Sequence, residues 1–258
     1  MIPEPGSPAH RALYDYLLAL ADDELILGHR DSEWCGHAPI LEEDIAFANI
    51  ALDEIGHASV WYALLSDLAG EDPAVYPDRL VYFRGSEEYR CAQMVELPKG
   101  DWAFSILRQY LFDALEKLRL ERLAQSAYPP LAEASAKIRL EEIYHHRHTS
   151  AWVRRLSLGT EESHRRMQAA LDELWPHTAQ FFNLAAGEEA LASAGYVPDP
   201  GELLRAWETT VIPFLEECGL VLTQSPRMPA QRGEHSAYLA ELLEDLQRVA
   251  CLEPQAQW

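Results

Sequence analysis

Four long stretches of this chain place apolar residues at steps of three and four, the spacing that gives an α-helix one apolar face. By contrast, no run of alternating β-branched residues predicts a strand. Two hairpins of long helices predict an all-α fold, an antiparallel four-helix bundle with extra C-terminal helices. The long helices are expected at residues 8–29, 40–69, 101–127 and 131–158. After a fifth helix that begins beyond residue 160, shorter helices are expected at 177–186, 200–218 and 234–249.

Residues that commonly begin or end helices support these limits. Gly70 follows the second stretch, and glycine often ends a helix in the left-handed conformation. Asp101 and Thr160 precede the third and fifth helices, where their side-chain oxygens can accept hydrogen bonds from first-turn N–H groups. Pro129 is expected to end the third helix, because proline disrupts a helix interior.

The segments between these helices are polar or rich in proline and glycine. Residues 30–39, 71–100 and 219–233 are therefore expected to be loops, with one short helix inside the second. No linker-like stretch separates two parts of the chain. Residues 1–258 are therefore predicted to form one domain.

The balance of charges excludes several classes of function. The chain has 42 Asp and Glu residues against 21 Lys and Arg, a formal net charge of −21. Binding to nucleic acid or to an anionic membrane needs a basic face, so neither is an expected partner. No run approaches the ~20 apolar residues of a membrane span. With no secretion signal and four widely spaced cysteines, a cytoplasmic protein is expected.

Two Glu-x-x-His pairs interrupt the apolar faces of the second and fourth helices. Glu54 precedes His57 and Glu142 precedes His145 by three positions, so each pair shares one helix face. In di-iron carboxylate bundles, two such pairs and one carboxylate from each remaining helix surround two metal ions. Carboxylates offset the charge of the ions, and imidazoles bind them terminally. The pattern therefore indicates a di-metal centre in the core.

The motif alone is weak, because a chain with 28 glutamates and 10 histidines contains it by chance. A third pair, Glu161 and His164, lies in the polar run TEESHRR at a helix start and is expected to be solvated. The first two pairs differ, since each follows an isoleucine, Ile50 or Ile138, four residues before its glutamate. Those two pairs are therefore expected to face the core.

The first and third helices must supply the remaining carboxylates. Glu24 continues an apolar stripe and precedes Glu54 by 30 residues, and Asp113 precedes Glu142 by 29. Glu116 also has apolar neighbours, so spacing favours Asp113 and periodicity does not exclude Glu116. The predicted metal ligands are Glu24, Glu54, His57, Asp113, Glu142 and His145. The alternative is that these residues hydrogen-bond to one another across a bundle without metal. A haem site is less favoured, because axial ligands do not explain acids in the same layer.

Other polar residues near the bundle are expected to be structural. Trp34 and Gly36 lie in the turn between the first two helices, where glycine permits a strained backbone and tryptophan packs over the bundle end. His146 and His148 do not share the face of Glu142, so they are expected to be solvated or paired with acids.

The stretch at residues 20–56, LADDELILGHRDSEWCGHAPILEEDIAFANIALDEIG, resembles the PaaC subunits of bacterial phenylacetyl-CoA ring-epoxidase complexes, within the ferritin-like superfamily. EWCGHAP is the most specific block. The resemblance covers most of the chain and thins over residues 219–250. It continues at RQYLFDA (108–114), at Tyr144–His145 and Trp152, at Leu174–Trp175, at AWE (206–208) and at the final QW.

This resemblance implies a ferritin-like bundle that pairs with a sister subunit, PaaA, and forms larger assemblies. In such complexes PaaA carries the working di-iron centre, binds the CoA thioester and epoxidises the aromatic ring with dioxygen. A flavin and iron–sulfur reductase supplies electrons from NADPH. PaaC in well-known members is regarded as a structural partner whose metal site has degenerated.

The chain departs from those members at the predicted ligands. They have an apolar residue and glutamine at the positions of Glu54 and His57, and no acid near Glu24 and Glu142. The expected function is a PaaC-type subunit of an oxygenase for phenylacetyl-CoA that keeps a di-iron, or manganese–iron, centre of its own. The alternatives are a metal-free scaffold subunit and a stand-alone ferritin-like di-metal oxidase.

Overall fold

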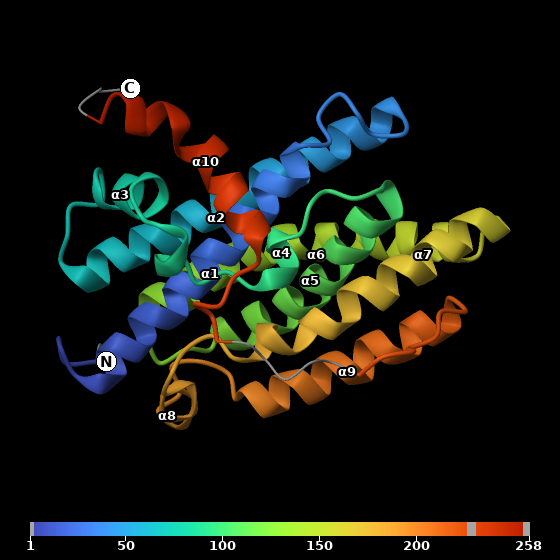
Figure 1. Ribbon diagram of the computed structural model, residues 1–258. Coiled ribbons are helices and arrows are strands. Elements are labelled where there is room, and N and C mark those ends of the chain that lie inside the picture. The colour runs from blue at the N-terminus through green and yellow to red at the C-terminus, as the bar shows by residue number, and fades with distance from the viewer. Residues whose placement is uncertain (1–2, 226–230, 255–258) are drawn as a thin grey trace.

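The computed structural model describes residues 3–225 and 231–254. Over these ranges the chain forms ten α-helices and two 3-10 helices, and contains no strand (Figure 1). The predicted all-α, ferritin-like bundle is confirmed. No helix within the same ranges is long and apolar enough to span a membrane. The grouping of residues 1–258 into one domain stays a prediction.

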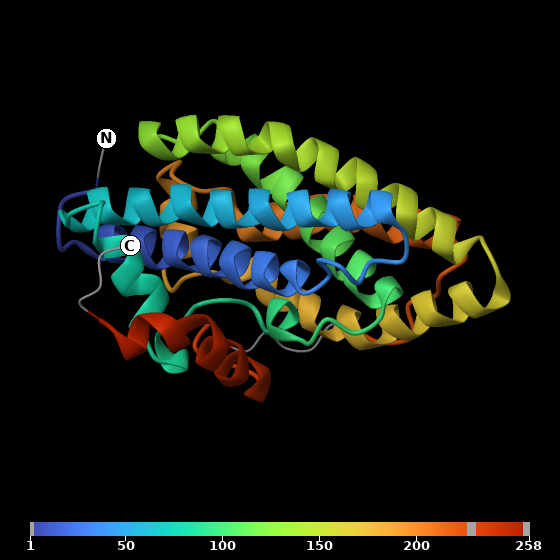
Figure 2. The ribbon, with the colours of Figure 1, turned by 90° about the horizontal axis from the view of Figure 1, so that it is seen from above.

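Two helical hairpins form the bundle. Helix α1 (Pro8–Ser32) packs along α2 (Leu41–Ala69), and α5 (Trp102–Leu123) packs along α6 (Pro129–Ser157). The hairpins meet where α2 contacts α6 (Figure 2). The apolar stripes of all four helices therefore face a common core.

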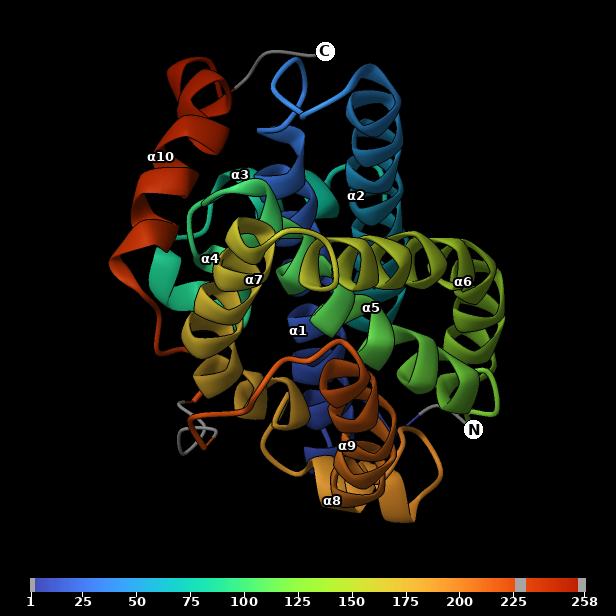
Figure 3. The ribbon, with the colours of Figure 1, turned by 90° about the vertical axis from the view of Figure 1, so that its right-hand side faces the viewer.

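The remaining elements surround this bundle. Helices α7 and α9 pack on α5, and α10 packs on α3 and α4 (Figure 3). The bounds are α3 (Tyr76–Tyr82), η1 (Ser86–Glu88), α4 (Gln93–Glu96), α7 (Glu161–Leu174), η2 (Trp175–Phe182), α8 (Glu188–Ser193), α9 (Pro200–Glu217) and α10 (Ala237–Leu252).

The predicted caps are confirmed. Gly70 has a φ of 69° after α2. Asp101 accepts a hydrogen bond from the N–H of Phe104 at 3.0 Å, and Thr160 accepts one from the N–H of Ser163 at 3.1 Å. These contacts satisfy N–H groups that the first turn of a helix leaves without an intrahelical partner.

Several predicted boundaries are wrong. Helix α5 ends at Leu123, and Pro129 begins α6 instead of ending α5. The physical reason is that proline is tolerated in the first helical turn, where its missing N–H is not needed. Helix α1 runs three residues further than predicted. The predicted helix at 177–186 is the 3-10 helix η2, and α8 follows it. Part of the predicted loop at 219–233, residues 226–230, lies outside the described ranges, as does the final QW.

The segment at 71–100 contains three short helical elements where one was predicted, and a buried carboxylate holds it to the bundle. Asp22 on α1 is fully buried. It accepts hydrogen bonds from Arg84 Nη2 at 2.6 Å, from the Arg90 N–H at 2.7 Å and from the Tyr62 hydroxyl at 2.5 Å. A buried charge with three donors is satisfied, so this contact fixes the segment against α1.

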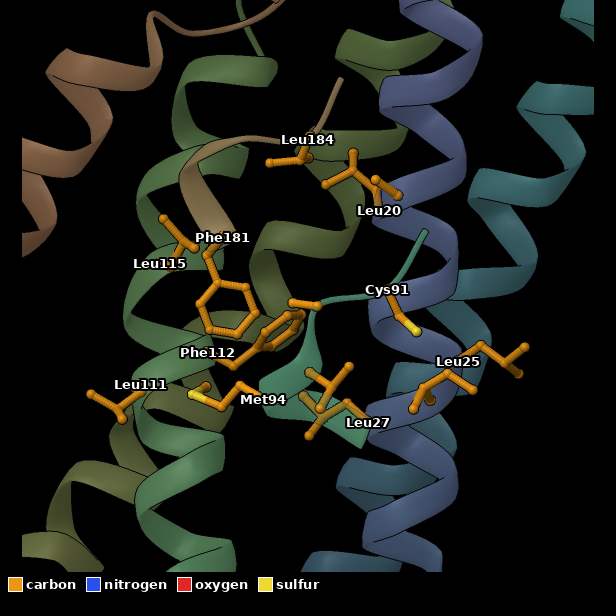
Figure 4. Packing of buried hydrophobic residues seen from close by; sticks show 14 of the residues in the cluster. Leu20, Leu25, Leu27, Cys91, Met94, Leu111, Phe112, Leu115, Phe181 and Leu184 are labelled. Carbon is orange, nitrogen blue, oxygen red and sulfur yellow. The ribbon is translucent and has the colours of Figure 1, made fainter. Parts of the chain in front are cut away.

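Apolar side chains from distant parts of the chain fill the core between α1 and α5 (Figure 4). Leu20 and Leu27 of α1 face this layer, and Phe112 of α5 packs against Phe181 with ring centroids 5.7 Å apart. The 3-10 helix η2 therefore contributes to the same core as the long helices.

Aromatic residues close the end of the bundle near the first turn, as predicted. The Trp34 indole packs edge-on against Trp102 at 5.0 Å, and Trp102 contacts Phe47 at the same centroid distance. Trp34 Nε1 donates to Ser105 Oγ at 2.8 Å. Gly36 has a φ of 78°, a left-handed conformation that favours glycine.

The closest approach of α1 and α2 predicts opposite effects for two Gly→Ala substitutions. A Cβ on Gly28 would lie 3.0 Å from the Ala51 carbonyl oxygen and from Glu54 Cβ, whereas a Cβ on Gly56 would meet nothing within 4 Å. We expect Gly28→Ala to lower the free energy of unfolding by about 1–3 kcal/mol through overpacking. Gly56→Ala, the matched control on the exposed helix face, should raise it by roughly 1 kcal/mol. Chemical denaturation measures both, and equal effects would contradict the close approach.

Candidate metal centre

Three helices bring five of the six predicted ligands together in the bundle core. These residues form two overlapping groups, and the possible ligand atoms within each group lie within 4.8 Å of one another. The groups are Glu24, Glu54 and His57, and Glu54, Glu142 and His145. All five side chains are buried. Because Glu54 belongs to both groups, the arrangement has the form of two adjacent sites that share one carboxylate.

The imidazole Nδ1 atoms face the carboxylates. His57 Nδ1 lies 3.6 Å from Glu24 Oε2 and 3.6 Å from Glu142 Oε1. His145 Nδ1 lies 3.0 Å from Glu142 Oε1 and 3.4 Å from Glu54 Oε1. The centroids of the two rings are 5.9 Å apart. Each ring therefore presents one nitrogen to the same cluster of oxygens.

The other ring nitrogens bind acids in a crossed pattern. His57 Nε2 on α2 contacts Glu141 Oε2 on α6 at 2.7 Å, and His145 Nε2 on α6 contacts Asp53 Oδ2 on α2 at 3.2 Å. Carboxylates commonly hold metal-binding histidines in this way, because the contact fixes the tautomer and the ring orientation. Asp53 and Glu141 are not among the residues predicted from the sequence. The sequence does contain a signal for these two residues: an acid stands directly before the glutamate in both core-facing Glu-x-x-His pairs.

Several buried atoms of the cluster have no hydrogen-bond partner among the described residues. They are both carboxylate oxygens of Glu24, one each of Glu54 and Glu142, and His57 Nδ1. Leaving such atoms unpaired in a low-dielectric interior is costly. A bound cation would satisfy all of them, so this donor set of oxygens and imidazole nitrogens fits a pair of transition-metal ions.

Asp113, the sixth predicted ligand, is fully buried but belongs to neither group. Its carboxylate accepts hydrogen bonds from Gln109 Nε2 and from the Thr149 hydroxyl, both at 2.7 Å. Glu116, the alternative, forms an ion pair with Arg119 and keeps one oxygen without a partner. Both oxygens of Asp113 thus have partners, whereas Glu116 has one oxygen without a partner among the described residues, and the structure does not decide between them.

Burial and crowding of acids shift the pKa values of the cluster. Burial, followed by the nearby Glu54 charge, raises the pKa of Glu24 well above its usual value and also raises that of Glu142. Burial alone would raise the pKa of Glu54, but the neighbouring Glu24 and His145 side chains lower it to about 2. Burial opposes the charged form of His145, yet contacts with Asp53, Glu142 and Glu54 raise its pKa. Without metal, protons therefore supply part of the positive charge that the carboxylates need.

The third Glu-x-x-His pair and the histidines next to His145 lie outside the candidate metal centre. Glu161 is exposed, whereas His164 is half-buried and contacts the Ser157 carbonyl oxygen at 2.8 Å. His148 Nε2 lies 3.0 Å from Glu43 Oε2, so this histidine lies beside an acid, as expected. His146 is half-buried against the ring of Tyr110, with centroids 5.7 Å apart.

Two comparisons with known proteins agree with the resemblance seen in the sequence. Residues 4–258 match the family model PaaA_PaaC, described as phenylacetic acid catabolic protein. The C subunit of 1,2-phenylacetyl-CoA epoxidase from Escherichia coli is 38% identical over 245 residues, which cover 94% of this chain and 98% of that protein. The similarity therefore spans both hairpins and the helices that follow them.

The raised pKa of Glu24 predicts how the stability of metal-depleted protein depends on pH. Folding favours protonated Glu24, so its contribution to the free energy of unfolding falls as the pH rises above its ordinary pKa of 4.5. Glu24→Gln removes this loss. We expect the variant to gain stability relative to the parent between about pH 5 and about pH 8, by at most about 1.4 kcal/mol per pH unit.

Urea unfolding of chelator-treated protein at both pH values measures this difference. The matched control is Glu133→Gln, which makes the same chemical change at an exposed position of α6. A Glu24→Gln variant whose stability difference from the parent does not change with pH would contradict the prediction.

Proposed function

Because the chain belongs to the phenylacetic acid catabolic protein family, we propose that it is the C-type subunit of a multicomponent oxygenase that epoxidises phenylacetyl-CoA. Its partners in that role are a PaaA-like catalytic subunit, further copies of itself and a reductase component. We propose in addition that it holds a di-iron, or manganese–iron, centre of its own. The observation that supports this second proposal is the buried cluster of unpartnered carboxylate oxygens.

In the proposed centre, Glu54 would be a ligand common to both sites, because it belongs to both groups of donor atoms. His57 and His145 would each offer Nδ1, the nitrogen that faces the carboxylates. Glu24 and Glu142 complete the sites, with Asp113 or Glu116 as the carboxylate from α5. Four carboxylates would then balance the charge of two divalent ions, which makes burial of the centre favourable.

When bound, a di-iron centre of this class supplies the reduction of dioxygen with electrons from a reductase. The residues of this chain position the donors and exclude water. Asp53 and Glu141 hold the two imidazoles in place. Buried Ile50 and Ile138 lie one helical turn before the two glutamates. Metal binding would compete with protons at Glu24, Glu142 and His145, because the pKa of each group is raised.

A second candidate is a metal-free scaffold subunit, and one observation favours it. Gln109 Nε2 donates to Glu54 Oε1 at 2.6 Å and to Asp113 Oδ1 at 2.7 Å, so one amide links two acids without any metal. Under this alternative, Glu54→Ala leaves the activity of the complex unchanged and does not lower stability, since a buried acid is removed. The two candidates therefore differ in metal content and in the effect of this substitution.

Metal content is the direct test of the di-metal centre. We expect protein reconstituted anaerobically with ferrous iron to retain about two ions per chain, as ferritin-like di-iron bundles do. His57→Gln removes a nitrogen donor and should lower the retained iron to about one ion or less. Elemental analysis after desalting gives the stoichiometry, and X-ray anomalous scattering at the iron edge locates the ions.

Glu161→Gln is the matched control, because it alters the exposed Glu-x-x-His pair outside the cluster. It should bind as much iron as the parent. Retention of less than one ion by the parent would instead support the scaffold.

The crossed acids give an independent prediction. Loss of an outer carboxylate that holds a metal-binding histidine commonly lowers metal affinity about 10- to 100-fold. We expect a loss of metal affinity in this range for Glu141→Gln and for Asp53→Asn, because each substitution removes the carboxylate that holds one imidazole in place. Competition with a fluorescent chelator measures the affinities. Glu133→Gln should have no effect, and equal affinities in all three variants would argue against the assigned ring orientations.

Association with a sister subunit tests the role in the oxygenase. We expect the chain to co-elute from a sizing column with the PaaA-like catalytic subunit of the same organism. Glu54→Gln should co-elute equally well, because Glu54 is fully buried and cannot touch a partner directly. Separate elution of the parent proteins would contradict the partnership. Rapid ferrous oxidation by the isolated chain without a reductase would favour a stand-alone oxidase.

A further inference from the structure

A second cluster of metal-binding side chains lies where the C-terminal segment meets the bundle. It consists of Cys91, Glu96 and His235, whose possible ligand atoms lie within 4.8 Å of one another. Cys91 and Glu96 belong to the segment between the hairpins, and His235 directly precedes the N-cap of α10. We propose that these three residues bind a zinc ion that fastens the C-terminal segment to the bundle.

The donor atoms converge on one carboxylate oxygen. His235 Nδ1 lies 2.6 Å from Glu96 Oε1, and Cys91 Sγ lies 3.6 Å from the same oxygen. Cys91 and Glu96 are both fully buried. The side chain of Cys91 points into the packed layer beside α1 (Figure 4). A sulfur, an oxygen and a nitrogen donor therefore meet at one buried point.

Hydrogen bonds to neighbouring groups fix the orientation of His235 and Glu96, as is common for metal ligands. His235 Nε2 donates to the Tyr89 carbonyl oxygen at 3.1 Å, so in the neutral ring Nδ1 carries the lone pair. That lone pair faces Glu96 Oε1 at 2.6 Å, a distance at which the two atoms share a proton. A zinc ion would replace this proton and move the two atoms apart, because tetrahedral ligands about 2.0–2.1 Å from zinc lie more than ~3 Å from each other. The second oxygen of Glu96 accepts from the Ser236 N–H at 2.7 Å and from its hydroxyl at 2.6 Å. Both His235 and Glu96 thus have the backbone or side-chain partners expected around a metal.

Donor chemistry and charge favour zinc. Thiolate, imidazole and carboxylate are all zinc ligands, and thiolate disfavours magnesium and calcium. One thiolate and one carboxylate cancel the charge of Zn²⁺, so the buried site would be neutral. Water would fill the fourth position of the tetrahedral ion. The competing arrangement is a proton on His235, which gives an ion pair with Glu96 and leaves Cys91 as a thiol.

The position of the cluster explains what a bound ion would do. Helix α10 packs mainly on α3, η1 and α4, and Arg30 of α1 donates to the Tyr238 carbonyl oxygen at 3.4 Å. Its buried apolar residues are Leu239, Leu242 and Leu243. A zinc ion held by residues 91, 96 and 235 would join segments about 140 positions apart. Metal binding of this kind contributes directly to folding free energy.

Cobalt provides a spectroscopic test, because Co²⁺ replaces zinc and shows a thiolate-to-metal absorption band only when cysteine is a ligand. We titrate the full-length chain with Co²⁺ and then displace the Co²⁺ with Zn²⁺. One equivalent should produce the band, and zinc should abolish it. Cys91→Ser should lose the band, whereas Cys218→Ser, which alters a buried thiol in none of the metal-binding groups, should keep it.

The test distinguishes this site from the di-metal centre, which contains no cysteine. A Glu54→Gln variant should keep the thiolate band, and His235→Gln should lose or weaken it. Zinc should also raise the midpoint of thermal unfolding more in the parent than in Cys91→Ser, which keeps the di-metal centre. A parent protein without the band, or a band that survives Cys91→Ser, overturns the proposal and leaves the protonated His235–Glu96 pair.

Discussion

The burial of like charges in one layer of the bundle is the constraint on which the rest of the structure depends. Glu24, Glu54, Asp113 and Glu142 are each at most 1% exposed, and their mutual repulsion must be offset inside the protein. Protons, the His145 imidazolium and the Gln109 amide supply part of that compensation. The oxygens that still lack partners show that this compensation is incomplete among the described residues. An ordinary structural core would replace such acids with apolar side chains, which is why a cation gives the simplest physical account of them.

Local sequence signals were sufficient for the long helices and for most of the cluster. The apolar stripes at steps of three and four fix which face of each helix is buried, so Glu24, Glu54, His57, Glu142 and His145 could be assigned to the core. Contacts across helices could not be predicted in the same way. Thr149 of α6 donates to Asp113 of α5, and Gln109 of α5 donates to Glu54 of α2; these contacts emerge only from the packed structure. The Cys91–Glu96–His235 cluster joins distant segments and leaves no periodic signal.

Family membership and the cluster address different parts of the function. The family places the chain in phenylacetic acid catabolism. The cluster of acids and histidines in the bundle core is the basis for proposing that this chain also binds metal, beyond offering a surface for assembly. These roles are compatible, because the cluster lies in the bundle core and a partner would bind the outside. The close crossing at Gly28 supports the cluster, since it brings α1 near enough to α2 for Glu24 and Glu54 to meet.

The crossed acids connect the interior with the protein surface. The side chains of Asp53 and Glu141 are 39% and 54% exposed, yet each contacts a buried imidazole. Water screens their negative charge on one side only. A molecule bound to this face would exclude water and remove that screening. The electrostatic interaction between each carboxylate and the imidazole that it contacts would then become stronger. The basicity of the His145 ring would then depend on what lies against the outer face of α2 and α6, so a molecule bound at the surface would alter the core without movement of the backbone.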